Sequence, residues 1–316
     1  MTDMTENHKP EGFYLNTPEN RDYTSTLQGL EYAYLTGMTL EARAIKCDND
    51  HNLIVELGKH RGIIPRSEVQ MSSGGEKVRD IAVITRVGKP VAFKVTAVNK
   101  NGGEYAAVLS RRAAQEECYD EFISKLSPGD IIDAKITHEE PFGAFCDVGR
   151  GIISLLSVDC ISVSRILHPK DRFGVGQYIK AVVKESAAET GRISLSHKEL
   201  LGTWEENTAA FSPGETAAGI VRSIEPYGIF VELTPNLAGL AEWRDGVEEG
   251  QSAAVYIKSI IPEKMKVKLV IVDSYSSEKA PTLPEYRITS GHIDRWKYSP
   301  DCCPKVIESI FGGEEI

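Results

Sequence analysis

The chain repeats a pattern of prolines, glycines and aromatic residues after 85 positions. The stretch from residue 128 reads PGDIIDAKITHEEPFGAFCDVGRGIIS, and the stretch from residue 213 reads PGETAAGIVRSIEPYGIFVELTPNLAGLAE. The pairs that keep this register are Pro128 and Pro213, Gly129 and Gly214, Pro141 and Pro226, Gly143 and Gly228, and Phe145 and Phe230. Because one register holds at five special positions, we interpret the two stretches as copies of one structural unit.

A third, weaker copy begins at Gly37 with GMTLEARAIKCDNDHNLIVELGKHRGIIP. A polar turn, DNDHN at 48–52, replaces the turn of proline, aromatic residue and glycine that the other two copies share. The copy aligns by its apolar pattern and by GII at 62–64, which parallels GII at 151–153. The sequence therefore predicts three units, at about 36–112, 127–202 and 212–274.

Short segments that are apolar or alternate with period two predict the strands of each unit. In the second unit these segments are 131–137, 144–148, 178–183 and 193–196, and in the third they are 218–224, 229–233, 253–260 and 267–272. Five short strands in some 75 residues, with a longer irregular connection in the middle, favour a small Greek-key barrel. A hairpin meander in a two-sheet sandwich is the alternative. We therefore expect an all-β chain of three tandem five-stranded barrels.

The connections between the units carry helical patterns. Apolar residues at helical spacing predict helices in 111–126 and 198–211, a short helix at 26–35 leads into the first unit, and residues 1–22 are predicted to be disordered. Pro304 and Gly312 bracket a further predicted helix, at 304–311. The resulting division is 1–35 (disordered start and lead-in helix), 36–112 (basic first repeat), 113–126 (linker helix), 127–202 (second repeat), 203–211 (linker helix), 212–274 (third repeat) and 275–316 (C-terminal tail).

The composition indicates an ordinary soluble globular protein, with 41% hydrophobic and 26% charged residues among 316. No apolar run approaches the roughly 20 residues that span a bilayer, and the first residues show no secretory signal, so we expect a cytoplasmic protein with no membrane partner. The six cysteines are scattered without a CxxC pair, which indicates reduced thiols.

No set of residues predicts catalysis or a metal site. The histidines form no sequence constellation with a nucleophile, and the tail residues His292, Asp294, Cys302 and Cys303 make a poor tetrahedral set because two of the cysteines are adjacent. We therefore expect no enzyme activity, no metal and no cofactor.

Charge is distributed unevenly over the units. The chain has a net charge of -10, but residues 36–112 carry +5, residues 127–202 carry -1 and residues 212–274 carry -3. The first unit is thus cationic without the aromatic turn, and we expect it to dock on a polyanionic or protein partner while the other two hold flexible single strands. Its candidate basic patch is Lys46, Lys59, Arg61 and Arg66.

The second unit resembles the RNA-binding repeat of bacterial ribosomal protein S1. The resemblance rests on PFGAF at 141–145, GII at 151–153, GQ at 176–177 and GRISLS at 191–196; the third unit shares YGIF at 227–230, and the first ends in a similar LSRR at 109–112. The resemblance implies barrels of the oligonucleotide-binding (OB) fold. A histidine that the family often carries is replaced by Pro65, Ser154 and Glu242, which implies a weaker or differently specific RNA surface.

Aromatic side chains on the repeated turn can hold a single strand by stacking on bases while cations bind its phosphates. The candidate RNA-binding residues are Phe142, Phe145, Arg192, Tyr227, Phe230 and Lys266. The alternative for Phe145 and Phe230 is burial in the core of a small barrel, and the alternative for Arg192 is a solvated charge. A twisted strand that leaves a tight turn can bring both rings of a pair to one groove.

We therefore expect a protein that binds single-stranded RNA and, as the resemblance implies, helps to hold mRNA on the small (30S) ribosomal subunit. A free RNA chaperone or translational regulator is the alternative with the same chemistry. A scaffold for protein partners, with barrels that have lost RNA binding, is the alternative from another class.

Overall fold

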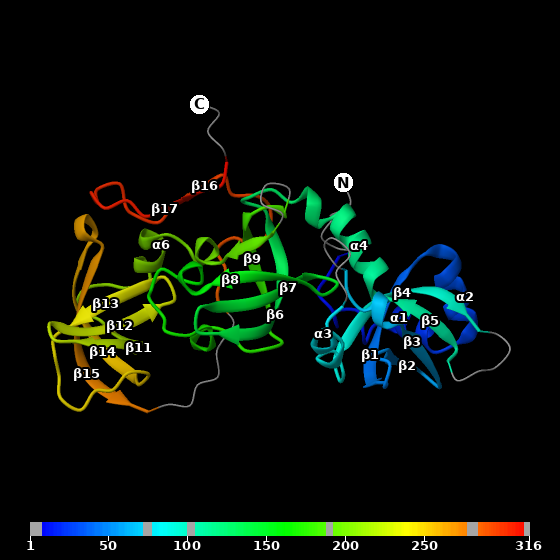
Figure 1. The fold of residues 1–316 in the computed structure, drawn as a ribbon. Helices are drawn as coiled ribbons and strands as arrows, with labels where there is room; N and C mark the ends of the chain where they lie inside the picture. Colours follow the sequence, from blue (N-terminus) through cyan, green and yellow to red (C-terminus); the bar gives the residue numbers. More distant parts are fainter. Residues whose placement is uncertain (1–7, 72–77, 100–104, 188–191, 277–283, 313–316) are drawn as a thin grey trace. The chain divides into compact units, whose positions relative to one another are not determined.

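The computed structural model describes residues 8–71, 78–99, 105–187, 192–276 and 284–312 and contains three closed five-stranded barrels (Figure 1). The prediction of tandem five-stranded barrels joined by short helices is confirmed, and barrel closure excludes the two-sheet sandwich. By contacts the chain forms two compact units, one of residues 1–125 with 147–153 and one of residues 126–146 with 154–316. Among the described residues, no helix is both long and apolar enough to cross a membrane.

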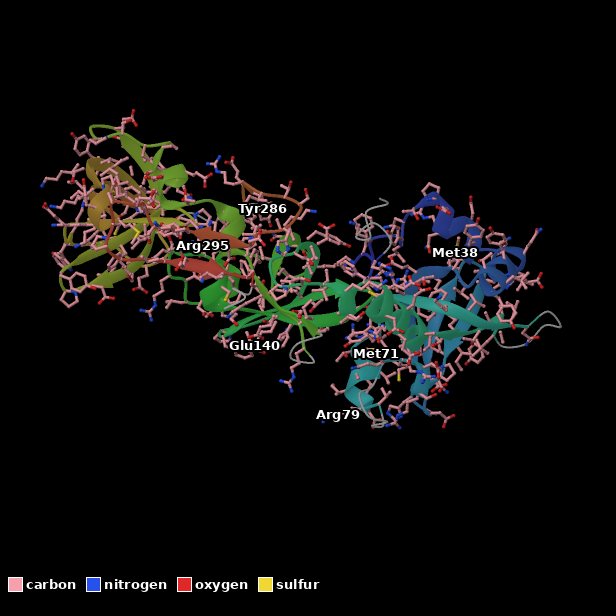
Figure 2. All side chains as sticks on the ribbon, turned by 90° about the horizontal axis from the view of Figure 1, so that it is seen from above. Met38, Met71, Arg79, Glu140, Tyr286 and Arg295 are labelled. Carbon is pink, nitrogen blue, oxygen red and sulfur yellow. The ribbon has the colours of Figure 1, made fainter. Side chains whose placement is uncertain are left out.

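The first barrel closes in the strand order β1-β2-β3-β5-β4. Its strands are β1 (Thr39–Cys47), β2 (Leu53–Leu57), β3 (His60–Ile64), β4 (Pro90–Val98) and β5 (Ala107–Ser110). Inward residues such as Leu53, Val55 and Phe93 are fully buried. The accompanying helices are α1 (Pro18–Thr24), α2 (Leu27–Thr36), α3 (Asp80–Ile84) and α4 (Arg111–Glu121), with 3-10 turns at Arg66–Glu68 and Ile123–Lys125. Met71, labelled in Figure 2, donates its amide N–H to Gln115 of α4 (2.9 Å).

The prediction of disorder over residues 1–22 is wrong for residues 8–22. Glu11 is buried and forms a two-point ion pair with Arg111 (Nε–Oε1 2.6 Å, Nη2–Oε2 3.0 Å), and its backbone N–H donates to Asp147 (2.8 Å). The segment has little hydrophobic periodicity, but it places a carboxylate against a buried guanidinium. Residues 1–7 lie outside the described part of the chain.

The second barrel has the order β10-β8-β7-β6-β9, and the third has the order β11-β12-β13-β15-β14. The strands are β6 (Ile131–Glu140), β7 (Gly143–Gly149), β8 (Ile152–Ser157), β9 (Tyr178–Glu185) and β10 (Ser194–Ser196), then β11 (Thr216–Glu225), β12 (Gly228–Thr234), β13 (Leu237–Ala241), β14 (Ser252–Ile261) and β15 (Lys266–Tyr275). The 3-10 turns are Val158–Cys160, Pro169–Asp171, Lys198–Leu201 and Pro262–Lys264.

The helix predicted for 198–211 is broken in two. The turn Lys198–Leu201 ends at Gly202, whose φ of +85° lies in the left-handed region, and helix α6 (Trp204–Thr208) begins with a capping box between Thr203 and Glu206. The glycine therefore interrupts the helical pattern, because its backbone adopts a conformation that a helix does not contain.

The C-terminal tail forms a small hairpin in place of the helix predicted for 304–311. Strands β16 (Arg295–Lys297) and β17 (Glu308–Ile310) pair antiparallel. Upstream, the tail adds main-chain hydrogen bonds to the second barrel, from Ile293 N–H to Gly129 (2.9 Å) and from Ile131 N–H to Gly291 (3.0 Å). The buried Trp296 packs into the apolar cluster of the third barrel. The sheet pairing and this burial outweigh the local helix signals at Pro304 and Gly312.

A buried ionic cluster joins the second barrel to the third within the second unit. Glu232 on β12 is 5% exposed and pairs with Arg172, which follows the 3-10 turn Pro169–Asp171 and is 6% exposed. Arg222 on β11 holds the same carboxylate at two points, with Nε–Oε2 2.9 Å and Nη2–Oε1 3.1 Å. Glu232 is thus an anion that two arginines from two barrels share.

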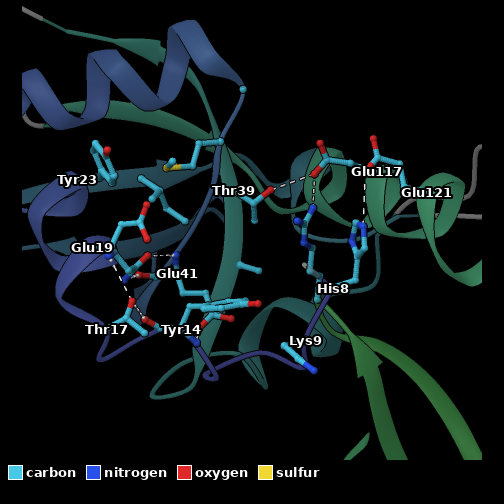
Figure 3. A pocket seen from close by; sticks show the side chains of 16 residues that line it. His8, Lys9, Tyr14, Thr17, Glu19, Tyr23, Thr39, Glu41, Glu117 and Glu121 are labelled. Atoms are coloured by element: carbon cyan, nitrogen blue, oxygen red, sulfur yellow. Dashed lines mark hydrogen bonds and ion pairs between the residues drawn. The ribbon is translucent and has the colours of Figure 1, made fainter. Parts of the chain in front are cut away.

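A cavity in the first unit lies over a buried carboxyl. It has a volume of about 360 Å³ and is lined by residues that include Tyr14, Tyr23 and Glu41 (Figure 3). Glu41 Oε2 accepts the backbone N–H groups of Gly12 and Tyr14, both at 3.0 Å. Burial raises the pKa of Glu41 to about 7. Such a carboxyl stabilises the fold below its unfolded pKa of about 4.5, and this contribution is lost as the pH rises through 7.

Replacing Glu41 by glutamine should stabilise the first unit relative to the wild type as the pH rises from about 4.5 to 7, by up to about 3 kcal/mol, because the neutral amide cannot ionise. Hydrogen exchange of first-unit peptides, compared between variant and wild type at each pH, measures this difference. The control is Glu19→Gln, an exposed residue of the same cavity. A ratio of exchange rates that does not change with pH would contradict the prediction.

Substituting Glu232 by alanine should destabilise the second unit by about 3 to 5 kcal/mol, because Arg172 and Arg222 lose their shared anion. The control is Glu242→Ala, which removes an exposed ion pair to Lys258 (3.2 Å) and should cost less than about 1 kcal/mol. Urea unfolding followed by tryptophan fluorescence reports on this unit, because Trp204, Trp243 and Trp296 all lie in it. Equal midpoints for the two variants would exclude the stabilising role of the cluster.

Candidate nucleic-acid interface

The aromatic pair of the second barrel lies where β6 turns into β7. Phe142 stands on the turn and is 56% exposed, and Phe145 is half-buried on β7. The ring centroids are 6.0 Å apart and the rings are perpendicular. Glu140, labelled in Figure 2, ends β6 beside this turn. The structure thus brings the two rings together, as the twist of a strand leaving a tight turn predicts.

The third barrel repeats this geometry at the same register. Tyr227 is 69% exposed on the turn between β11 and β12, Phe230 is half-buried on β12, and their centroids are 6.2 Å apart at an interplanar angle of 87°. Neither Phe145 nor Phe230 fills a barrel core, because the inward positions belong to Ala144 and Cys146 in β7 and to Ile229 and Val231 in β12. Strand alternation therefore leaves both phenylalanines on the outer face.

The shared glycine of the turn is needed for the close approach of two strands. A Cβ atom on Gly228, whose φ is +149°, would lie 2.5 Å from the carbonyl oxygen of Ala241, and one on Gly143 would lie 2.5 Å from that of Leu156. Only a glycine fits this contact without shifting the backbone of the next strand. The repeat therefore requires glycine between its two aromatic residues.

His138 completes the aromatic cluster of the second barrel and was not predicted. Its ring stacks on Phe145, with centroids 6.2 Å apart and an interplanar angle of 20°, and its Nε2 atom lies 2.8 Å from Glu140. The available signal was its place on the strand before the turn, where a residue of one strand can face its antiparallel neighbour. The third barrel has Ser223 at the corresponding register and so lacks a third ring there.

The two predicted cations, Arg192 and Lys266, are exposed at or just before the last strand of their barrels. Lys266 begins β15, and Arg192 lies two residues before β10. In the third barrel, Phe230 pairs with Leu240, which in turn pairs with Lys268, so an aromatic ring and a cation lie on one outer row of three strands. Ser154, at the position where the family often has histidine, is buried and donates its hydroxyl to Ile193 (2.8 Å).

The four residues of the predicted basic patch lie at the two ends of one hairpin. Lys46 is opposite Ile54 near one end, where Arg66 is held by Asp80 (2.5 Å) and by the carbonyl of Val78. Lys59 and Arg61 flank the turn at the other end of β2 and β3. The structure therefore separates the patch into two pairs, Lys46 with Arg66 and Lys59 with Arg61. The guanidinium of Arg66 is already bound by Asp80 and by the carbonyl of Val78.

The carboxylates around the first-unit cavity also have partners. Glu117 binds Lys94 (2.5 Å), Arg150 and the hydroxyl of Thr39 (3.2 Å). Within the described residues, no group of three histidine, cysteine or acidic side chains could hold a metal ion. The carboxylates of the cavity are therefore already bound by other side chains, whereas Phe142 and Tyr227 on the aromatic turns are exposed and can contact a ligand.

Comparison with known proteins agrees with this geometry. The model of the S1 RNA binding domain matches residues 35–112 and 125–198. Small ribosomal subunit protein bS1 of Staphylococcus aureus is 29% identical over 242 residues, and the bS1 homolog of Bacillus cereus is 31% identical over 239 residues. These alignments cover 72% and 73% of this chain but only 59% and 58% of the relatives, so the chain spans somewhat more than half of their length.

Among solved structures, a multidomain protein with nucleic acid binding domains from Streptococcus pneumoniae is 15% identical, with a TM-score of 0.24; the match covers 74% of this chain and 73% of that one. The assignment rests on the two domain matches and on the bS1 relatives, which agree with three closed five-stranded barrels and a shared 85-residue register. The chain contains S1 RNA binding domains in tandem, and its resemblance to the bacterial ribosomal protein S1 family is confirmed.

Proposed function

We propose that this chain binds single-stranded RNA on the aromatic turns of its second and third barrels. The observation that carries the proposal is the repetition of one exposed ring and one half-buried ring, about 6 Å apart, at the same register of both barrels. Grouped exposed apolar side chains often mark interaction sites, and bases of any sequence can stack on aromatic rings. Arg192, two residues before β10, and Lys266, at the start of β15, supply charge for the phosphates.

The proposed role of this binding is to hold mRNA on the small ribosomal subunit in the cytoplasm. The bS1 relatives support it, and the chemistry of the platforms fits a protein that must release its RNA. A chain with a net charge of -10 gains little affinity from counterion release, so stacking supplies a large share of the binding free energy. Binding should then be modest and reversible.

The first barrel has a separate role in this proposal, as the docking unit. It has no aromatic turn: His51 and Ile54 stand where the second barrel has Phe142 and Phe145, and Ile54 is 4% exposed. Its positive charge lies on exposed residues such as Lys46, Lys59 and Arg61. These cations can contact a polyanionic surface, such as that of the ribosomal subunit, without stacking on bases.

Replacing Phe142 or Tyr227 by alanine should weaken the binding of an A/U-rich single-stranded RNA by about 1 to 3 kcal/mol each, because each ring stacks on one base. Fluorescence anisotropy of the full chain at two salt concentrations measures the affinity. Both rings are exposed, so the variants should remain folded. The matched control is Tyr34→Ala on α2, which is 51% exposed and should bind like the wild type.

Binding by the wild type with losses only in the two turn variants would support the RNA platform. An absence of RNA binding by the folded wild type would overturn it and favour a scaffold for protein partners. Co-sedimentation with 30S subunits then separates the ribosomal role from that of a free RNA chaperone.

A further inference from the structure

The outer face of β12 carries an aromatic ring at Phe230 and, two residues later, a buried carboxylate at Glu232. Phe230 and Glu232 alternate with the inward Ile229 and Val231, so both project from the same face of the strand. Phe230 is half-buried beside the exposed Tyr227, whereas Glu232 is 5% exposed under the second barrel. The aromatic platform of the third barrel therefore ends at the junction between the barrels, about 7 Å along the strand.

The segment that covers this junction connects β8 to β9 in the second barrel. It leaves β8 at the aromatic turn, where the N–H of Val158 donates to the carbonyl of Phe142 (3.0 Å). It then reaches the third barrel, where the N–H of Ser164 donates to Pro235 (3.3 Å) and Arg172 pairs with Glu232. The segment 158–172 thus runs from the aromatic turn of the second barrel to Glu232 and Pro235 of the third barrel.

The contacts that hold this segment are built from buried groups. Asn236, fully buried, accepts the N–H of Val163 (2.9 Å) and donates to the carbonyls of Lys198 (2.8 Å) and Gly202 (3.0 Å). Asp171 lies 3.7 Å from Arg222, whose guanidinium also holds Glu232. Buried amide and ionic contacts therefore hold the segment in place at both ends.

Two cations of this segment are exposed. Arg165 follows Ser164, and Lys170 precedes Asp171. Neither side chain forms an ion pair with any residue that the structure describes, in contrast to Arg172 and Arg222 on either side of the junction. The segment 158–172 therefore presents two exposed positive charges that have no ion-pair partner among the described residues.

We propose that Arg165 and Lys170 form a phosphate-binding subsite, which the second barrel contributes to the RNA strand stacked on the third barrel. The inference rests on the proposed function and adds to it. A strand stacked on Tyr227 and Phe230 that continues toward Phe142 passes the segment 158–172, and its phosphates meet these two side chains. The subsite binds the backbone of single-stranded RNA and reads no base, because both groups are cations without a stacking partner.

The test compares the full chain with Arg165→Ala/Lys170→Ala and with a control, Lys125→Ala/Lys305→Ala, that removes the same charge from exposed positions outside the segment. The probe is a labelled oligouridine of about 12 nucleotides, long enough to pass both platforms. Affinity is measured by anisotropy over a salt series. Two lost phosphate contacts should lower the slope of log affinity against log salt by about 1.4 and weaken binding roughly tenfold at low salt, while the control slope stays near the wild-type slope.

The outcomes separate this inference from the proposed function. If the wild type binds and Tyr227→Ala weakens binding, but the Arg165/Lys170 variant has the slope of the control, the subsite is wrong and the platform stands. If the folded wild type does not bind, the proposed function fails and the subsite with it. Circular dichroism of all variants checks that the barrels remain folded.

Discussion

Strand alternation in a closed barrel is the constraint on which the rest of this structure depends. In β7 and β12 the inward positions are filled by small and branched apolar residues, so every larger or charged residue of these strands must face outward. Phe145 and Asp147 share one outer face, as do Phe230 and Glu232, and both pairs keep the 85-residue register. The same two outward positions thus supply a half-buried aromatic ring and a buried carboxylate in both barrels.

The free-energy cost of burying a carboxylate is offset by different groups at Glu232 and at Asp147. Glu232 lies between two arginines, which offset its desolvation by charge. Asp147 is 2% exposed and accepts backbone N–H groups from Glu11, Gly149 and Gly151, and its burial together with the charge of Glu11 raises its pKa to about 6. A carboxylate at this register is therefore stabilised by guanidinium groups in one copy of the repeat and by backbone amides in the other.

The sequence predicted the barrels because their signals are local. The repeated PFG and PYG turns, the alternating strands and the spacing of Gly143 and Gly228 all express geometry within one unit. The structure then located both phenylalanines on the outer face, a choice that the pattern alone left open. His138 escaped prediction because its role depends on the pairing of β6 with β7, which places its ring against Phe145 across seven residues of chain.

The errors have a common physical cause. Residues 8–22 and 304–311 show weak or misleading local patterns, and both are organised by partners outside the segment itself. Glu11 meets Arg111 across 100 positions, and β17 pairs with β16 at the other end of a hairpin that packs on the third barrel. Local propensity decides little where a buried ion pair or a strand partner supplies the larger free energy.

The net charge of -10 does not show which cations are available at the surface, because several arginines are paired with carboxylates inside the fold. Arg111, Arg172 and Arg222 neutralise buried carboxylates and contribute nothing to the outer field. Exposed cations such as Arg192 and Lys266 lie on the surface of the second and third barrels. In the proposed function, the affinity for a single strand depends on how many rings and exposed cations one strand can reach together, and this number depends on how the barrels of the second unit are joined.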